Sequence, residues 1–421
     1  MNQASPEEVS LQNAAIRQQL AHVTSLVEEY IEISTLNAGK TLTIQEHGEQ
    51  SRIHTIVVQE TYKLLHAIKG PLDTVFCHFE NVAHTGAVRA LLEMGVFHAL
   101  PQDGTSKTAE TLAKELNADK ELIIRLMRMA TVWGPFKEVV VEEYAHTRYS
   151  LVYLVPEVNG IFKVLVDEYQ PAKLRFHEFF KLNGWVNPIQ DNNSPYTFAH
   201  RTGGKNMWEF MGQFPERMKS FNYAMQVQSS AASWAVALYP FKEVLSQFKT
   251  TEDTPLVVDI GGGKGHILRQ IKELSGGAVK GRFILQERQE VLDVISEDEL
   301  PGIERQEYNF FTPQPLKGAV IYYLRRVFHD WPDAVCVEIL KNIAADITDK
   351  ARQRVVIADD VLPEKGADAE AAWMDLTMMT LAGTERTEKQ WRKLLDDAGF
   401  RLERTFVGPG TNYAAVEAFL K

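Results

Sequence analysis

The stretch from Leu256 to Leu268, LVVDIGGGKGHIL, constrains the fold more than any other part of the chain. Its apolar, β-branched start predicts a buried strand that ends near Asp259, and the glycines predict a turn into a helix that begins around His266. Glycine adopts backbone angles closed to other residues and lets a ligand approach the main chain. In open α/β folds, ligands bind at the carboxyl edge of the parallel sheet. The stretch therefore predicts a ligand site in an α/β domain.

The spacing of the glycines excludes two nucleotide-binding motifs. A dinucleotide fingerprint has its third glycine three residues after the second, but His266 stands three residues after Gly263. A phosphate loop has Ser or Thr directly after its lysine, but Gly265 follows Lys264. The pattern that remains suits a nucleoside ligand without a pyrophosphate, although a glycine-rich turn in another kind of α/β enzyme would look the same.

Short apolar runs in the second half of the chain predict further buried strands. They are LVVDI at 256–260, RFILQ at 282–286, VIYYL at 320–324 and VVIAD at 355–359. Amphipathic segments follow these runs, and an antiparallel pair is expected at 402–407 and 413–419. This order predicts a doubly wound, Rossmann-like α/β sheet with an antiparallel carboxyl-terminal pair.

The first half of the chain reads as mostly helical. We expect a helix over 5–34, a polar loop over 37–50 and further helix that is interrupted at Gly70-Pro71. Residues 108–149 then predict helix, turn, helix and a β wing, which is an arrangement that DNA-binding regulators use. The second of these helices has acidic residues beside its few basic ones, and the net charge of the chain is −11, so we expect no nucleic-acid partner.

Composition narrows the class of protein. The 421 residues are enough for two or three domains, and 45% hydrophobic with 24% charged residues is ordinary for a globular protein. Cys77 and Cys336 stand far apart without metal-ligand spacing, which indicates a reducing compartment rather than disulfides or zinc. Because no run of about 18 apolar residues occurs and the polar start is unlike a signal peptide, we expect a cytoplasmic protein with no membrane partner.

Three further segments carry a family resemblance. They are EYNFFTPQPLKGAVIYYLRRVFHDWPD at 307–333, RVVIADDVLP at 354–363 and DLTMMTLAGTERTEKQWRKLLDDAGF at 375–400. Together with the glycine turn, they resemble the class I S-adenosylmethionine-dependent O-methyltransferases of the caffeate and flavonoid type, most of all the fungal enzymes of secondary metabolism. The resemblance extends from about Pro71 to the carboxyl end.

The resemblance implies a domain plan and partners. It implies an amino-terminal helix and linker over 1–50, a helical, winged-helix-like dimerisation and substrate-lid domain over 51–240, and an S-adenosylmethionine-binding catalytic domain over 241–421. The expected cofactor is S-adenosyl-L-methionine, the expected assembly is a homodimer, and the expected acceptor is a small aromatic or polyketide-like molecule. Nothing in the chain resembles the acidic metal cluster of the magnesium-dependent catechol enzymes, so we expect no metal.

The resemblance also implies the catalytic residues, with His329 as general base and Asp359 and Glu385 as the acids that orient it. Methyl transfer from a sulfonium to a phenol is an in-line displacement, and a phenol with a pKa near ~10 is mostly protonated at pH 7. A positioned base must therefore remove its proton, and histidine suits this task. We expect His329 to be neutral near pH 7.

Other family positions match residues of this chain. The residues expected to bind the cofactor are Gly261, Gly262, Gly263, Glu287, Asn309, Phe310, Arg325 and Ser229. The residues expected to line the acceptor pocket are Phe221, Met225, Asp330, Met378 and Met379. Glu287 and Asn309 depart from the family, which usually has aspartate at both positions. An asparagine still accepts a hydrogen bond through its carbonyl, but it adds donors and removes a charge.

The sequence therefore predicts an S-adenosylmethionine-dependent O-methyltransferase that acts on a phenolic or enolic hydroxyl of a secondary metabolite. An alternative stays open, because some proteins that resemble this family keep the cofactor site but catalyse dehydration or pericyclic rearrangement, using the bound sulfonium electrostatically. The presence of His329 favours methyl transfer. Asn309 and the QERQEV context at 286–291 keep the alternative open.

Overall fold

The computed structural model describes residues 5–277, 279–296 and 298–421, except for the side chains of residues 228–231. The chain forms two compact units. The amino-terminal unit comprises Met1–Val23, Glu60–Leu174 and Trp208–Ser230, and the sheet unit comprises Thr24–Gln59, Arg175–Met207 and Ala231–Lys421. The architecture confirms the predicted fold class, a mostly helical first part followed by a doubly wound α/β sheet. The domain boundaries at residues 50 and 240 stay a prediction.

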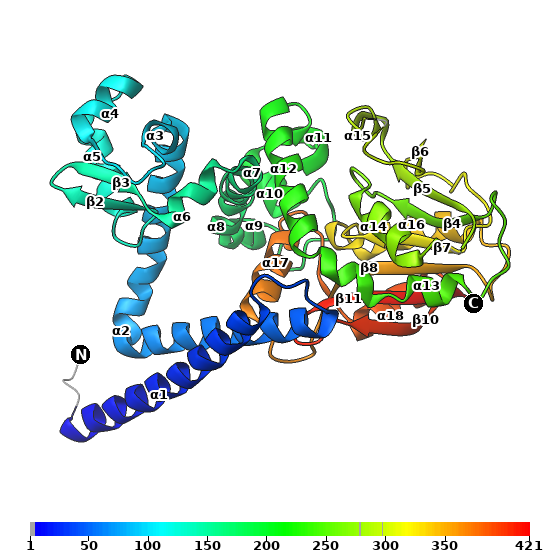
Figure 1. Cartoon of the computed structure of the whole chain (residues 1–421), viewed down its shortest axis with the longest axis horizontal. Coiled ribbons are helices and arrows are strands. Elements are labelled where there is room, and N and C mark those ends of the chain that lie inside the picture. The colour runs from blue at the N-terminus through cyan, green and yellow to red at the C-terminus, as the bar shows by residue number, and fades with distance from the viewer. Residues whose placement is uncertain (1–4, 278, 297) are drawn as a thin grey trace. The chain divides into compact units, whose positions relative to one another are not determined.

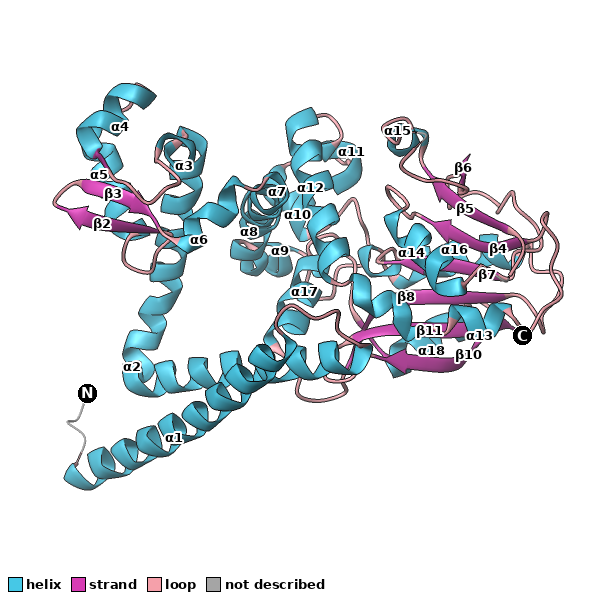
Figure 2. Ribbon diagram, in the orientation of Figure 1, coloured by secondary structure: helices cyan, strands magenta, loops and turns pink. Residues whose placement is uncertain are grey.

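The sheet unit is built on an eight-stranded sheet whose strands lie side by side in Figure 2. Its strands are β4 (Pro255–Ile260), β5 (Arg282–Glu287), β6 (Glu304–Glu307), β7 (Ile321–Arg325), β8 (Arg354–Leu362), β9 (Arg386–Thr387), β10 (Phe400–Val407) and β11 (Tyr413–Leu420). The order is β10-β11-β8-β7-β4-β5-β6, and the short β9 pairs with β8. All neighbours pair in parallel except β11, which is antiparallel to both β8 and β10 (Figure 1).

The order of the strands determines where a ligand can bind. The chain runs outward from β4 in both directions, to β5 and β6 on one side and to β7 and β8 on the other. In open α/β sheets the crevice for ligands lies at this reversal, outside the carboxyl ends of the strands. The glycine turn follows β4 and His329 follows β7, so the reversal brings the two predicted motifs to the same edge of the sheet.

Helices cover the sheet because its parallel strands are apolar on both faces. The helices of this region are α13 (Phe241–Leu245), α14 (His266–Ser275), α15 (Gln289–Leu292), α16 (Asp333–Ala344), α17 (Ala369–Met379) and α18 (Glu388–Asp397). Helix α14 shows how they attach, because Ile267, Leu268 and Ile271 recur at helical spacing and are buried in a cluster with β4, β5 and β7. The result is a packed core under the carboxyl edge of the sheet.

Shorter helices complete the sheet unit. They are α9 (Phe176–Leu182), α10 (Pro195–His200) and the one-to-two-turn segments η3 (Ser233–Leu238) and η4 (Phe328–Asp330). The segment η4 is the turn that carries His329. The long helices α1 (Pro6–Asn37) and α2 (Ile44–Met94) run through both units in sequence.

The amino-terminal unit contains the predicted helix-turn-helix and wing. Its elements are α3 (Val96–Ala99), β1 (Lys107–Thr108), α4 (Ala109–Leu116), α5 (Lys120–Ala130), β2 (Phe136–Val140), β3 (Glu143–His146), α6 (Arg148–Leu151), η1 (Val152–Leu154), α7 (Pro156–Lys163), the π-helix η2 (Val164–Tyr169), α8 (Gln170–Leu174), α11 (Met207–Met211) and α12 (Pro215–Ala231). Between α4 and α5 the turn forms because Asn117 adopts a left-handed conformation and the Asp119 side chain caps α5. Strands β1, β3 and β2 form the wing.

Two local predictions differ from the structure, and one is confirmed. The loop expected over 37–50 is shorter, because α2 begins at Ile44 with a capping box in which Thr43 and Glu46 bond to each other's backbone amides. Strand β6 was not predicted, since an edge strand with mostly exposed side chains lacks an apolar run. The break at Gly70-Pro71 is confirmed, because Gly70 has φ 73° and ψ 175° inside α2.

Within the described residues, no single helix is long and apolar enough to cross a membrane, and a bent pair, Arg148–Leu154 with Pro156–Leu174, has the required length and composition only when the two helices are taken together.

Candidate active site

The glycine turn leaves the backbone after β4 open to a ligand. Gly261 and Gly263 have φ of 72° and 57°, and the Gly261 amide donates to the Gln286 carbonyl over 2.8 Å. A Cβ at Gly262 would overlap the Asp259 carboxylate, so this position accepts no side chain without a shift. A Cβ at Gly263 would meet no heavy atom within 4 Å, so this part of the turn faces open space.

Two carboxylates beside the turn each have a buried oxygen that lacks a hydrogen-bond donor among the described residues. Within the described part of the chain, Asp259 Oδ2 and Glu287 Oε2 are buried and have no hydrogen-bond partner. Burial raises the pKa of each group to about 7. A buried acceptor without a donor is costly, and a ligand that brings hydroxyl or amino donors removes this cost. The turn and Glu287 thus fit the ribose-bearing cofactor that the sequence predicts.

The loops beyond the turn place the other predicted cofactor residues. Arg325 ends β7, where burial lowers its pKa, and its Nη2 donates to the Ala232 carbonyl over 3.2 Å. The Phe310 ring lies edge-on to the Trp331 ring with 6.1 Å between centroids. Asn309 is exposed, and its Oδ1 accepts from the Phe311 amide over 3.1 Å, a bond that an aspartate at this position would also make.

His329 is buried at the carboxyl edge of the sheet and pairs with Glu385. The imidazole Nδ1 lies 2.8 Å from Glu385 Oε1, and Nε2 lies 3.6 Å from Asp330 Oδ1, which is too long for a hydrogen bond. Because the carboxylate accepts at Nδ1, that nitrogen carries a proton and Nε2 is the one left for chemistry. Of the two acids expected to orient the histidine, Glu385 makes the contact.

Asp359 acts on His329 only through its charge. The Asp359 side chain is buried within β8, and neither of its oxygens has a hydrogen-bond partner among the described residues. Burial raises the pKa of Asp359 to about 7 and that of Asp330 to about 6. When ionised, Asp359, Asp330 and Glu385 place three negative charges around the His329 imidazole.

This surplus of carboxylates decides the protonation of His329. Burial alone would lower its pKa, but Glu385, Asp330 and Asp359 outweigh burial and raise it to about 10. The partner responds in the opposite sense, because the His329 charge and hydrogen bond outweigh burial and lower the pKa of Glu385. The expectation of a neutral His329 near pH 7 is therefore wrong for the protein without ligands, in which the imidazole is charged.

Several residues around this pair were not identified from the sequence. Asp375 accepts from the Glu385 amide over 3.0 Å, and Arg326, with φ 53°, lies 3.8 Å from the Asp360 carboxylate. Gly383 and Arg386 flank the segment that holds Glu385. The contacts of Gly383 and Arg386 join segments about fifty residues apart, as between Arg386 and Asp333 (53 residues), so no local sequence pattern reveals these two residues. The one available signal was their position next to the expected Glu385.

The residues predicted to line the acceptor pocket fall in both units. Asp330 adjoins His329, and Met378 and Met379 end α17 with Met378 buried. Phe221 and Met225 belong to α12 of the amino-terminal unit, and their part in the pocket stays a prediction. Ser229 also lies in α12, and its side chain falls outside the described residues. We find no cluster of three His, Cys, Asp or Glu side chains suited to a metal in the portion of the chain that the structure describes.

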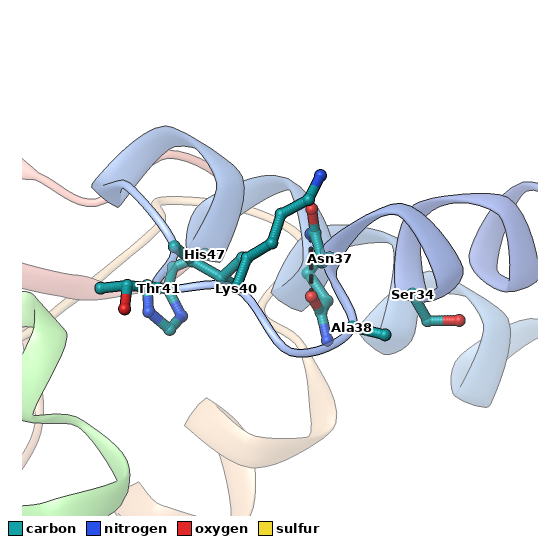
Figure 3. Close-up of a pocket in the computed structure, with 8 residues that line it drawn as sticks. Ser34, Asn37, Ala38, Lys40, Thr41 and His47 are labelled. Atoms are coloured by element: carbon teal, nitrogen blue, oxygen red, sulfur yellow. Dashed lines mark hydrogen bonds between the residues drawn. The ribbon is translucent and has the colours of Figure 1, made fainter.

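A hollow lies elsewhere in the sheet unit, at the turn between α1 and α2. It has a volume of about 320 Å³, and Figure 3 shows polar side chains around it, with Asn37 Nδ2 donating to Gln50 Oε1 over 3.0 Å. Its lining includes no carboxylate. The hollow is lined by one imidazole, that of His47, whereas the sheet edge holds a buried histidine paired with a carboxylate, and we therefore take the sheet edge as the candidate active site.

Comparison with known proteins gives consistent matches. A family model described as the O-methyltransferase domain matches residues 179–401, and one described as the O-methyltransferase dimerisation domain matches residues 76–156. O-methyltransferase opaF of Aspergillus ustus is 48% identical over 423 residues, covering 100% of both chains. The crystal structure of OxaC in complex with SAH and oxaline is 35% identical, with a TM-score of 0.81 over 96% of this chain and 100% of that one. A solved protein described as a pericyclic reaction enzyme is 25% identical, with a TM-score of 0.78 over 94% and 99%.

The geometry predicts how His329 titrates in the protein without ligands. Its pKa of about 10 exceeds the ordinary 6.5, so the stabilisation from the His329–Glu385 ion pair is complete below pH 6.5 and is lost as the pH rises toward 10. Nuclear magnetic resonance of ¹³C-labelled histidine, assigned by comparison with His329→Ala, should follow a charged ring at pH 7. Glu385→Gln should lower the midpoint. A wild-type ring that titrates between pH 6 and 7 would contradict the described charge balance.

Proposed function

Because the chain belongs to the S-adenosylmethionine-dependent O-methyltransferase family, we propose that it methylates a phenolic or enolic hydroxyl of a secondary metabolite with His329 as the general base. The observation that carries this proposal is the buried His329–Glu385 pair, 2.8 Å between Nδ1 and Oε1, at the sheet edge that also bears the glycine turn. Val327, two residues before the histidine, lies directly against Gly261. The base and the proposed cofactor turn are therefore neighbours.

The cofactor S-adenosylmethionine supplies an electrophilic methyl group when it is bound. We propose that Gly261, Gly262 and Gly263 give it close access to the backbone and that Glu287 accepts hydrogen bonds from its ribose. Glu287 Oε2 is buried and has no hydrogen-bond partner in the described part of the chain, which supports this role. Arg325, Asn309, Phe310 and Ser229 complete the proposed cofactor site, which the chain uses without a metal.

His329 takes the proton that the acceptor hydroxyl must lose. Glu385 holds Nδ1, so the neutral form of the ring presents the Nε2 lone pair to the hydroxyl. The neighbouring carboxylates make this nitrogen a strong base in the protein without ligands, where its pKa is about 10, close to the ~10 of a phenol. Asp330, Met378 and Met379, with Phe221 and Met225, line the acceptor pocket in this proposal.

The same carboxylates keep the His329 ring protonated at pH 7, and a protonated ring cannot accept the proton of the acceptor. A positive charge bound nearby disfavours the imidazolium and lowers its pKa. The cationic cofactor is such a charge, and a base that serves methyl transfer must lie close to it. The carboxylates raise the pKa of His329 and the cationic cofactor lowers it. In this proposal the two effects offset each other, so that His329 can accept a proton near neutral pH.

A second candidate function is dehydration or pericyclic rearrangement. The similarity to a pericyclic reaction enzyme at 25% identity favours it, as does the departure at Asn309. A pericyclic step needs no proton acceptor, whereas this chain has a buried histidine with a carboxylate partner. The 48% identity to an O-methyltransferase over the whole chain also supports methyl transfer.

A homodimer is part of the proposal. The chain carries the dimerisation domain of the family, and the part of α2 in the amino-terminal unit exposes a row of large apolar side chains. They are Tyr62, Leu65, Ile68, Leu72, Val75, Phe76, Phe79 and Val82. A second copy is the occupant that would cover such a face. We propose a cytoplasmic location on the two free cysteines and, from the net charge of −11, neither a nucleic-acid nor a membrane partner.

Cofactor affinity tests the placement of the ribose. Glu287→Ala should weaken S-adenosylmethionine binding by about 1 to 3 kcal/mol, because charged hydrogen bonds are lost at a buried site. Calorimetry measures the change, and Glu290→Ala, an exposed residue of α15, is the matched control. Equal affinity in both variants would mean that the ribose lies elsewhere.

Turnover tests the base. His329→Ala should lower kcat by about 10² to 10⁴-fold and leave cofactor affinity nearly unchanged, since the loss lies in the transition state. Raising the pH should partly restore the rate, because solvent then ionises the acceptor. The exposed His98→Ala serves as control. A variant that matches the wild type across the pH range would make His329 structural and favour the rearrangement.

Sedimentation tests the dimer. Phe79 is 71% exposed, so Phe79→Glu places a charge on the proposed interface and should shift the protein toward monomer at micromolar concentration. His78→Glu adds the same side chain one position away and should have less effect. Fully active wild-type monomer under these conditions would refute the homodimer.

A further inference from the structure

We propose that Arg386 is a positioning residue for His329, because its buried guanidinium holds the backbone turn on which the imidazole stands. The inference rests on the proposed role of His329 as the general base. Arg386 lies in β9, directly after Glu385, and its side chain is 1% exposed. Its guanidinium hydrogen bonds go to the backbone turn, to Asp333 and to Cys336, so it acts on the imidazole through the turn, and its charge also helps to lower the pKa of Glu385.

The guanidinium bonds to both ends of the turn around His329. Arg386 Nη1 donates to the Phe328 carbonyl over 3.0 Å, and Nη2 donates to the Trp331 carbonyl over 2.9 Å. Nη1 also donates to the Thr384 carbonyl over 3.2 Å. The planar fork of a guanidinium has fixed donor directions, so these bonds set the distance and angle between the turn and β9.

The rest of the side chain is held as firmly. Arg386 Nε and Nη2 lie 2.9 and 2.8 Å from Asp333 Oδ1 at the start of α16, and the guanidinium lies over the Trp391 ring at 5.1 Å from its centroid. Burying a charge is unfavourable unless its donors are matched, and a packed apolar side chain would often give equal stability. The bonds to backbone carbonyls therefore indicate that this arginine fixes geometry.

The neighbours of Arg386 in the chain hold the same turn. The Thr384 amide donates to the His329 carbonyl over 2.9 Å, and Glu385 bonds to the imidazole Nδ1. Gly383 allows this approach, since a Cβ there would overlap the His329 carbonyl oxygen. Residues 384–386 thus bond to the His329 carbonyl, to its ring and to the carbonyls on either side of it. A shift of β9 would therefore move the Nε2 atom of His329.

Cys336 makes weaker bonds to the same carbonyls, with its Sγ 3.3 Å from Phe328 O and 3.4 Å from Trp331 O. A thiol is a weak donor, so these contacts contribute less than the charged ones of Arg386. Arg386 Nη2 also donates to Cys336 Sγ over 3.5 Å, so Cys336→Ala removes only a weak contact of the guanidinium and leaves its bonds to the carbonyls, and it should lower kcat far less than loss of the arginine.

The experiment compares Arg386→Met and Arg386→Lys with Arg392→Met, the same change at an exposed arginine of α18. Arg386→Met should lower kcat by about 10- to 100-fold, as expected when a reacting group shifts by about an ångström. KM for the acceptor and calorimetric affinity for S-adenosylmethionine should change by less than about threefold, since the cofactor turn belongs to other segments. Arg386→Lys should recover part of the rate, and Arg392→Met should match the wild type.

A double-mutant cycle with His329→Ala shows whether Arg386 acts through the histidine. In the His329→Ala background, Arg386→Met should have almost no further effect on kcat. An equal loss in both backgrounds, or an unchanged kcat in folded Arg386→Met, would overturn the inference while leaving the base intact. If His329→Ala alone retains full turnover, the proposed base fails and the inference falls with it.

Thermal unfolding identifies variants that lose their fold. Should Arg386→Met fail to fold, Arg386→Lys, which keeps the buried charge, and Asp333→Asn decide the matter. The Asp333 side chain is 60% exposed, so its substitution loosens the guanidinium without opening the core. Both should lower kcat at constant cofactor affinity, and wild-type kcat in both would overturn the inference.

Discussion

The burial of one histidine among carboxylates is the interaction on which the rest of the active site depends. His329 and Glu385 are 56 residues apart in sequence, yet their side chains meet at 2.8 Å. They meet because His329 follows the carboxyl end of β7, whereas Glu385 immediately precedes β9, which pairs with the last residues of the neighbouring β8. Low dielectric strengthens the pairing and also penalises each unpaired charge. This pair is held in place by the apolar sheet, by the helices that cover its faces and by the bonds from residues 384–386 to the turn around His329.

The charge balance at this pair also separates methyl transfer from a pericyclic rearrangement. A buried histidine whose Nδ1 is paired with a carboxylate suits methyl transfer, in which a hydroxyl must lose its proton. A rearrangement that uses the cofactor only as a positive charge transfers no proton, so the pairing of Glu385 with His329 would contribute nothing to it. Both Asp359 oxygens and Glu287 Oε2 are buried without a hydrogen-bond partner among the residues that the structure describes, as expected of a site that binds polar ligands.

Much of the fold and site was accessible from sequence, and physical reasons explain the remainder. Apolar runs identified β4, β5, β7 and β8 because buried parallel strands need them, and Gly70 marked its break through its own backbone preference. The polar edge strand β6 lacked that signal. Local motifs located His329 and Glu385, but the protonation of His329 and the burial of Arg386 arise from segments that meet only in the folded chain.

Transfer of a labelled methyl group tests the central claim most directly. The protein is incubated with S-adenosylmethionine labelled at the methyl carbon and a panel of phenolic and enolic metabolites, and the products are analysed by mass spectrometry. The account predicts a product that carries one labelled methyl on oxygen and that forms far more slowly with His329→Ala. An unlabelled isomer or dehydrated product, formed equally well by both proteins, would contradict it.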